Sequence, residues 1–146
     1  MNDRLILLVE DNPQDELLTL RALRRCGVGA RVEVVRDGQQ ALDYLFLEGE
    51  FASRESPELP AVVLLDIGLP RLTGLEVLNR LRGDPRTALL PVVVLTSSDD
   101  DGDRLSSYQG GANSFVRKPM ASDDFTQTVA RLGLYWLTTN EPPKRD

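Results

Sequence analysis

Short apolar runs alternate with longer amphipathic segments along the chain. Parallel strands covered by helices read as short, nearly continuous apolar runs, so this alternation predicts an α/β fold: a parallel sheet with helices on both faces. In the second run Val32 and Val34 alternate with polar residues, and we therefore expect it at an edge of the sheet. The expected strands are Leu5–Val9, Arg31–Val35, Ala61–Leu65, Pro91–Leu95 and Asn113–Val116.

The segments between these runs carry helix signals. The first helix begins after Asn12, a good N-cap, has Asp15 in its first turn, where the helix dipole favours an acid, and ends at Gly27. Thr73, with Glu76 three residues later, forms a capping box for the third helix. The other expected helices begin at Asp37, cover roughly Asp99 to Gln109, and run from about Ser122 to Leu137.

Two segments extend beyond a minimal domain of this kind. The stretch from Glu48 to Pro60 is polar and long, which predicts a surface loop. Residues 140–146, NEPPKRD, are polar and contain two prolines, so we expect a flexible C-terminal tail. Residues 1–139 are expected to form one domain.

Composition excludes several classes of function. The 146 residues are 41% hydrophobic and 27% charged, as in an ordinary soluble domain, and the chain has no histidine and one cysteine, Cys26. Catalysis and metal ligation by histidine are thereby excluded, as is a disulfide within the chain. No apolar run approaches the ~20 residues of a membrane helix and no signal peptide is apparent, so we expect a cytoplasmic protein without a membrane partner. A net charge of −6 with dispersed basic residues argues against direct nucleic-acid binding.

Polar residues follow four of the expected strands at their carboxyl ends. Glu10 and Asp11 follow the first strand and Asp66 the third. Thr96 follows the fourth strand, and Lys118 comes two residues after the fifth. Because the carboxyl ends of parallel strands share one edge of the sheet, where open α/β sheets bind ligands, we expect these side chains to converge.

This set has a specific chemistry. Clustered carboxylates stay ionised when a cation lies among them, and ligands that are all oxygen favour a hard ion such as Mg²⁺. A carboxylate can also attack phosphorus and form an aspartyl phosphate, whose oxygens then need a cation and a hydrogen-bond donor. In this interpretation Asp66 is the nucleophile, Lys118 the cation and Thr96 the donor. Taken singly, Asp11 could be a helix-entry acid, Thr96 an N-cap and Lys118 a solvated lysine.

The full set resembles the response-regulator receiver domain of bacterial two-component signalling. The resemblance covers nearly the whole chain and includes Gly74 and the pair Lys118-Pro119. It implies a flavodoxin-like, doubly wound sheet of order 2-1-3-4-5, the order that the phosphate-signalling relatives of flavodoxin share. It also implies that a sensor histidine kinase phosphorylates Asp66. The Mg²⁺ ligands that it implies are Glu10 or Asp11 through water, Asp66, and the backbone carbonyl of Gly68.

The same resemblance implies a switch. In receiver domains the threonine moves toward the phosphoryl group and an aromatic residue swings inward, roles that fall here on Thr96 and Phe115. The bond between Lys118 and Pro119 would be cis and would aim the lysine. The start LILLVEDNPQD, the long loop before the third strand and the ending YWL are similar to stand-alone regulators that partner bacterial phytochromes. A bacteriophytochrome is therefore the expected kinase.

Without an output domain, the surface that phosphorylation changes has to be recognised by another protein or by a second copy of this chain. Leu134, Tyr135, Trp136 and Leu137 surround the end of the fifth helix with apolar groups, which predicts a homodimer through the fourth helix, fifth strand and fifth helix. The chain is thus expected to be a phosphoacceptor signalling protein rather than an enzyme.

Two alternative functions fit the sequence less well. The first is a Mg²⁺-dependent aspartyl-phosphate phosphohydrolase; such sites usually carry a second Asp two residues after the nucleophile, where this chain has Gly68. The second is calcium binding by the acids of residues 99–103, which fails the EF-hand pattern because Tyr108 stands where Glu is required. Acids that favour the start of a helix explain that cluster better.

Overall fold

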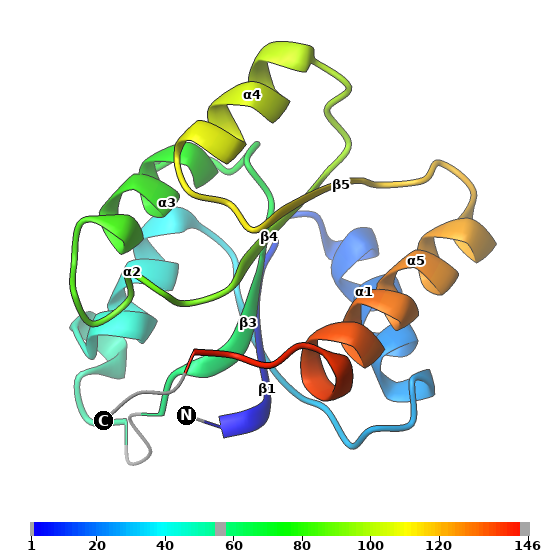
Figure 1. Ribbon diagram of the computed structural model, residues 1–146, viewed down its shortest axis with the longest axis horizontal. Coiled ribbons are helices and arrows are strands. Elements are labelled where there is room, and N and C mark those ends of the chain that lie inside the picture. Colours follow the sequence, from blue (N-terminus) through cyan, green and yellow to red (C-terminus); the bar gives the residue numbers. More distant parts are fainter. Residues whose placement is uncertain (1, 55–57, 144–146) are drawn as a thin grey trace.

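The structure is a computed structural model that describes residues 2–54 and 58–143. One parallel sheet has the strand order β2-β1-β3-β4-β5. Helices α1 and α5 cover one face and α2, α3 and α4 the other (Figure 1). The predicted α/β class, sheet order and edge position of the second strand are confirmed. The elements are β1 (Asn2–Val9), α1 (Pro13–Arg25), β2 (Arg31–Val35), α2 (Gly38–Phe46), β3 (Pro60–Leu65), α3 (Gly74–Arg82), β4 (Val92–Thr96), α4 (Asp101–Gln109), β5 (Ser114–Arg117) and α5 (Ser122–Leu134).

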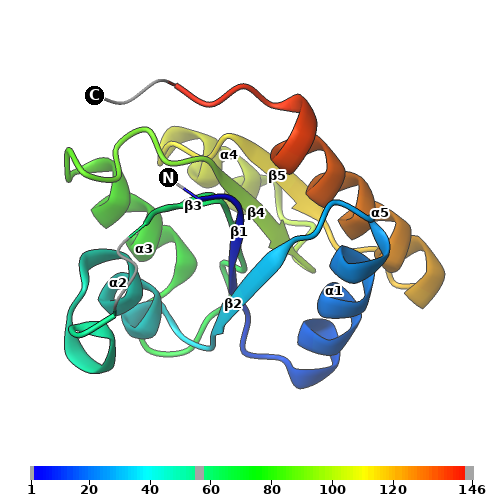
Figure 2. The same ribbon diagram turned by 90° about the horizontal axis from the view of Figure 1, so that it is seen from below.

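The inner strands divide the interior into two cores. Successive side chains of a strand point to opposite faces, so in β1 Ile6 and Leu8 join the core beneath α1 and α5, while Leu7 and Val9 join the core beneath α2 and α3. Every residue of β3 is buried. Figure 2 shows β1 between its neighbours β2 and β3, with helices on either side. This sandwich fixes the positions at which β1 and β3 end.

Side-chain caps begin several helices at the predicted places. The Asn12 side chain accepts hydrogen bonds from the N–H groups of Gln14 and Asp15, and Thr73 and Glu76 form the predicted capping box. Asp100 caps α4, so that helix begins at Asp101. The caps of α1 and α3 start both helices immediately after the edge of the sheet where the polar residues gather.

Two segments differ from the prediction. The connection before β3 is not wholly a loop: residues 49–51 form a 3-10 turn, and Phe51 packs edge-on against Tyr44 at 5.2 Å between ring centroids. The guanidinium of Arg54 lies over the same Tyr44 ring at 3.9 Å. The last helix changes form at Leu134 and continues as a π-helical turn, Tyr135–Thr139. The expected tail lies partly outside the described residues.

Gly74 marks the closest backbone approach behind the site. A Cβ there would lie 2.5 Å from the Asp66 carbonyl oxygen and 2.5 Å from Ile67 Cα, so the start of α3 would have to move away from the loop after β3. We expect Gly74→Ala to reduce the free energy of unfolding by about 1–3 kcal/mol, measured by urea denaturation. Gly83→Ala is the matched control, because its Cβ would meet nothing closer than 3.5 Å. Equal stability of the two variants would contradict this close-packing explanation.

Candidate functional site

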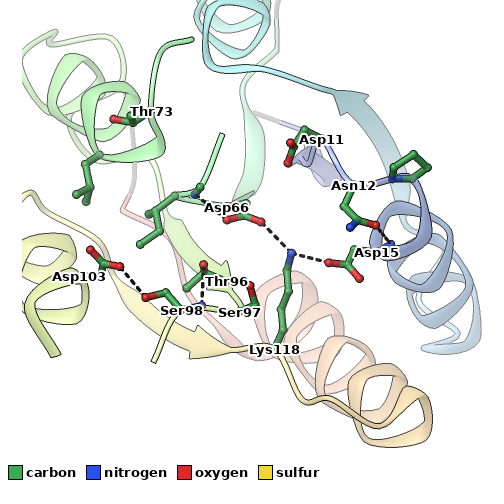
Figure 3. A pocket seen from close by; sticks show the side chains of 14 residues that line it. Asp11, Asn12, Asp15, Asp66, Thr73, Thr96, Ser97, Ser98, Asp103 and Lys118 are labelled. Atoms are coloured by element: carbon green, nitrogen blue, oxygen red, sulfur yellow. Dashed lines mark hydrogen bonds and ion pairs between the residues drawn. The ribbon is translucent and has the colours of Figure 1, made fainter. Parts of the chain in front are cut away.

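A cavity of about 690 Å³ opens at the carboxyl edge of the sheet. Its walls come from the loops that follow β1, β3, β4 and β5, and Figure 3 shows their polar side chains turned toward one another. Asp11, Asp66, Thr96 and Lys118 all line it, as the sequence predicted, and Gly68 belongs to its wall. Glu10 is not among the residues that line the cavity, and its side chain is only 2% exposed. The fold therefore brings together residues that are up to 108 positions apart.

The carboxylates fit a hard divalent cation. Glu10, Asp11 and Asp66 each offer an oxygen, and these three oxygens lie within 4.8 Å of one another. Within residues 2–54 and 58–143 this is the only such group of three. Mg²⁺ binds a few protein carboxylates and keeps several waters, so a half-open site with oxygen donors suits it. The acids of residues 99–103 form no such group, which agrees with their interpretation as helix-start acids.

The three carboxylates are not equivalent as ligands. Glu10 accepts hydrogen bonds on both oxygens, from Lys118 Nζ at 2.7 Å and from Asn12 N–H at 3.2 Å. Asp11 is exposed, and Asp66 Oδ1 accepts a hydrogen bond from Gly68 N–H at 2.8 Å. Asp66 Oδ2 also accepts a hydrogen bond, from Lys118 Nζ at 2.9 Å. Asp11 is thus the most available ligand, whereas Glu10 and Asp66 are each hydrogen-bonded on both oxygens.

Lys118 joins the acidic residues into one network. Its ammonium donates to Glu10 Oε1 at 2.7 Å, Asp66 Oδ2 at 2.9 Å and Asp15 Oδ2 at 2.9 Å, and its side chain is 5% exposed. Its backbone N–H donates to the carbonyl of Thr96 at 2.7 Å, which fixes the chain direction after β5.

Burial and neighbouring charges shift the pKa values of Lys118 and Glu10 in opposite directions. Burial by itself lowers the pKa of Lys118, but the hydrogen bonds to Glu10, Asp66 and Asp15 outweigh it, and the pKa stands well above its ordinary value. Burial raises the pKa of Glu10, and the contact with Lys118 only partly opposes that shift. The lysine is therefore charged at neutral pH.

One implied feature is wrong. The described residues contain no cis peptide bond, so the bond between Lys118 and Pro119 is trans. The lysine is aimed by its backbone hydrogen bond to Thr96 and by its three carboxylate partners instead.

Sequence reasoning missed Asp15. The sequence placed this residue in the first turn of α1 only because acids suit a helix start, whereas the structure turns its carboxylate into the cavity and onto Lys118 (Figure 3). The signal was present: the Asn12 cap begins the helix at the site's edge, so a residue three positions later can face the site.

Thr96 and Phe115, the two residues of the expected switch, lie in different parts of the structure. Thr96 is 3% exposed, and its Oγ1 accepts a hydrogen bond from Ser98 N–H at 3.3 Å. Ser98 in turn donates to Asp103 Oδ2 at 2.6 Å, which ties the loop after β4 to α4. Phe115 is half-buried and lines a separate cavity of about 250 Å³ beside α4. The structure thus brings Thr96 into the site and leaves Phe115 outside it.

This combination defines a class of protein. A doubly wound parallel sheet of order 2-1-3-4-5 binds its ligands at the carboxyl edge, where this chain gathers its acids and its lysine. Residues 6–130 match the response regulator receiver domain, and the chain belongs to that family. It is a receiver-domain signalling protein. Among the described residues no helix has the length and apolar character needed to cross a bilayer.

Several relatives are similar over nearly their whole length. The probable methanogenesis regulatory protein FilR2 of Methanothrix harundinacea is 43% identical over 139 residues, 95% of this chain and 87% of the relative. The phosphorylated cyanobacterial phytochrome response regulator RcpA is 37% identical, with a TM-score of 0.90 over 97% of this chain and 99% of that one. The Mn²⁺-bound response regulator Rcp1 is 32% identical, with a TM-score of 0.88 over the same shares. The bacteriophytochrome response regulator RtBRR is 48% identical, with a TM-score of 0.75 over 96% and 84%.

The buried ion pair gives a stability prediction. Lys118→Met would leave the Glu10 carboxylate buried beside other acids without its cation, so we expect a loss of about 3 kcal/mol in the free energy of unfolding at neutral pH. Adding Glu10→Gln removes the stranded charge and should recover much of that loss, which a double-mutant cycle in urea measures. Arg80→Met, at an exposed position of α3, is the control. Unchanged stability in Lys118→Met would show that the pair contributes nothing.

Proposed function

We propose that this chain is a response regulator that accepts a phosphoryl group on Asp66 from a sensor histidine kinase in a Mg²⁺-dependent reaction. The observation that supports this most is one cavity in which Asp66 contacts Lys118 and which Asp11 and Thr96 also line. Each of these residues has a distinct task in phosphoryl transfer.

We place the protein in the cytoplasm.

The chemistry follows from these positions. A carboxylate oxygen of Asp66 attacks phosphorus, the new O–P bond forms as the N–P bond to the donor histidine breaks, and the imidazole leaves with the electron pair. Lys118 donates an N–H to a phosphoryl oxygen, and the Thr96 hydroxyl donates to another. Asp66, the Gly68 carbonyl, and Glu10 or Asp11 through water would hold Mg²⁺, which would supply charge neutralisation for those oxygens.

Signalling would follow from the added charge. A phosphoryl group brings about −1.5 to −2 charge, which draws the Thr96 hydroxyl toward it and vacates space near β5. Phe115 would then move inward, away from the cavity beside α4, with Pro119 after Lys118 transmitting the change to α5. Moving such a switch from 1:99 to 99:1 takes about 5.5 kcal/mol of differential stabilisation. The affected surface is α4, β5 and α5.

A bacteriophytochrome is the proposed kinase. Two of the structurally similar proteins, RcpA and RtBRR, are response regulators of phytochromes, and this chain covers nearly all of each. FilR2, 43% identical, is a probable methanogenesis regulatory protein. Phosphotransfer from a purified, autophosphorylated bacteriophytochrome to this chain is therefore the test of the kinase assignment.

Phosphorylation can be tested by intact mass. Incubation with acetyl phosphate and Mg²⁺ should add one phosphoryl group to the wild type and none to Asp66→Asn, and excess chelator should abolish the adduct. Asp123→Asn, which removes an exposed acid from the first turn of α5, should be phosphorylated normally. Rapid multiple turnover of the donor would support the aspartyl-phosphate phosphohydrolase instead, and an adduct that persists in Asp66→Asn would exclude Asp66 as the acceptor.

We further propose a homodimer through α4, β5 and α5. Leu134 and Tyr135 are 48% and 46% exposed at the end of α5, and Leu105 on α4 is 58% exposed. The expected patch is smaller than the sequence suggested, because Trp136 and Leu137 are partly buried against the core beneath α1 and α5. Apolar exposure of this kind favours a partner.

The dimer is testable by light scattering. Leu134→Ser with Tyr135→Ser should convert a dimeric mass to a monomeric one at the same concentration, because the apolar contact is lost. Leu17→Ser, which removes an equally exposed leucine from α1, should leave the mass unchanged. A phosphorylated wild type that stays monomeric at high concentration would rule the dimer out.

A further inference from the structure

Every N–H donor of the Lys118 ammonium is already engaged. An ammonium has three donors, and the structure directs them to Glu10, Asp66 and Asp15 at 2.7, 2.9 and 2.9 Å. If a phosphoryl oxygen is to receive a hydrogen bond from this group, one of the three contacts must break. The choice of that contact decides how the site changes on phosphorylation.

Burial distinguishes the three partners. The Glu10 side chain is 2% exposed, so losing its cation would leave a charge without water or a partner. Asp66, 12% exposed, carries the phosphoryl group itself and remains beside the lysine. The Asp15 side chain is 27% exposed and can be hydrated once it is released. Asp15 is therefore the partner whose loss costs least.

Asp15 also connects two cavities. It lines the cavity of about 690 Å³ with Asp66 and Lys118, and it lines a second one of about 330 Å³ between the first turns of α1 and α5. Leu17 and Phe125 belong to that second cavity, which we call the α1–α5 groove. A released Asp15 carboxylate would change the charge and shape of this groove, which lies apart from the cavity beside α4 that Phe115 lines.

We propose that Asp15 is a positioning residue that competes with the phosphoryl group for Lys118. In the unphosphorylated protein it holds one lysine N–H; on phosphorylation the lysine transfers that N–H to a phosphoryl oxygen, and Asp15 turns to solvent at the α1–α5 groove. No bond is made or broken at Asp15 beyond this exchange of hydrogen bonds. The proposal rests on the proposed function of Asp66.

The first test measures binding of beryllium trifluoride, a phosphoryl mimic, in the presence of saturating Mg²⁺, by ¹⁹F NMR. Asp15→Asn lowers both the competition for Lys118 and the negative charge of the site, so it should bind the mimic about five- to tenfold more tightly than the wild type. Asp15→Glu, which keeps the carboxylate, should stay closer to the wild type. Glu16→Gln is the matched control: it removes an acid from the same turn, but one that pairs with Arg36 at 3.0 Å.

The second readout is the backbone amide spectrum. In the wild type, the mimic should shift Gln14 and Leu17 in α1 as well as Thr96, whereas in Asp15→Asn the α1 shifts should shrink and the Thr96 shift remain. A purely structural role for Asp15 would change thermal stability without separating these two groups of signals. Equal or weaker binding by Asp15→Asn, or an unmoved α1 in the wild type with a moved Thr96, would overturn the inference alone. Absence of binding by both proteins would overturn the proposed function together with it.

Discussion

The ammonium of Lys118, surrounded by Glu10, Asp15 and Asp66, is the interaction on which the site depends. Gathered acids repel one another, and a buried carboxylate such as Glu10 is tolerated only with a partner. The lysine supplies that partner and leaves the exposed carboxylate of Asp11 available to a metal. The positive charge of Lys118 therefore contributes both to the stability of the fold and to the chemistry expected at the site.

The fold makes this arrangement possible by ending strands β1, β3, β4 and β5 at one edge. Two apolar cores hold those strands in register, and the caps at Asn12 and Thr73 turn the chain into α1 and α3 immediately beyond it. Gly74 allows α3 to approach the loop that carries Asp66. The acids and the lysine therefore stand directly after strand ends, within one or two residues of the sheet. Asp15 reaches in from a helix and is the most exposed of the lysine's partners.

The family relationship and the local geometry complement each other. Membership of the receiver domain family rests on residues 6–130 and on structural similarity along nearly the whole chain. The geometry adds what family membership does not specify: Glu10 is largely occupied by Lys118 and Asn12, while Asp11 remains exposed. The acidic pair after β1 thus divides into a buried partner of the lysine, Glu10, and an exposed carboxylate, Asp11, that could bind a metal.

The sequence by itself determined the sheet order, through the resemblance to a known family. It also determined that Asp66, Thr96 and Lys118 stand at the ends of strands, because apolar runs and the polar residues that follow them are local features of the sequence. It could not determine that Trp136 turns inward, that the bond before Pro119 is trans, or that Asp15 contacts Lys118 across 103 residues. The burial of Trp136 and the contact between Asp15 and Lys118 depend on how the elements that carry these residues pack together. Contacts between side chains from separate elements follow from packing, which only the tertiary structure decides.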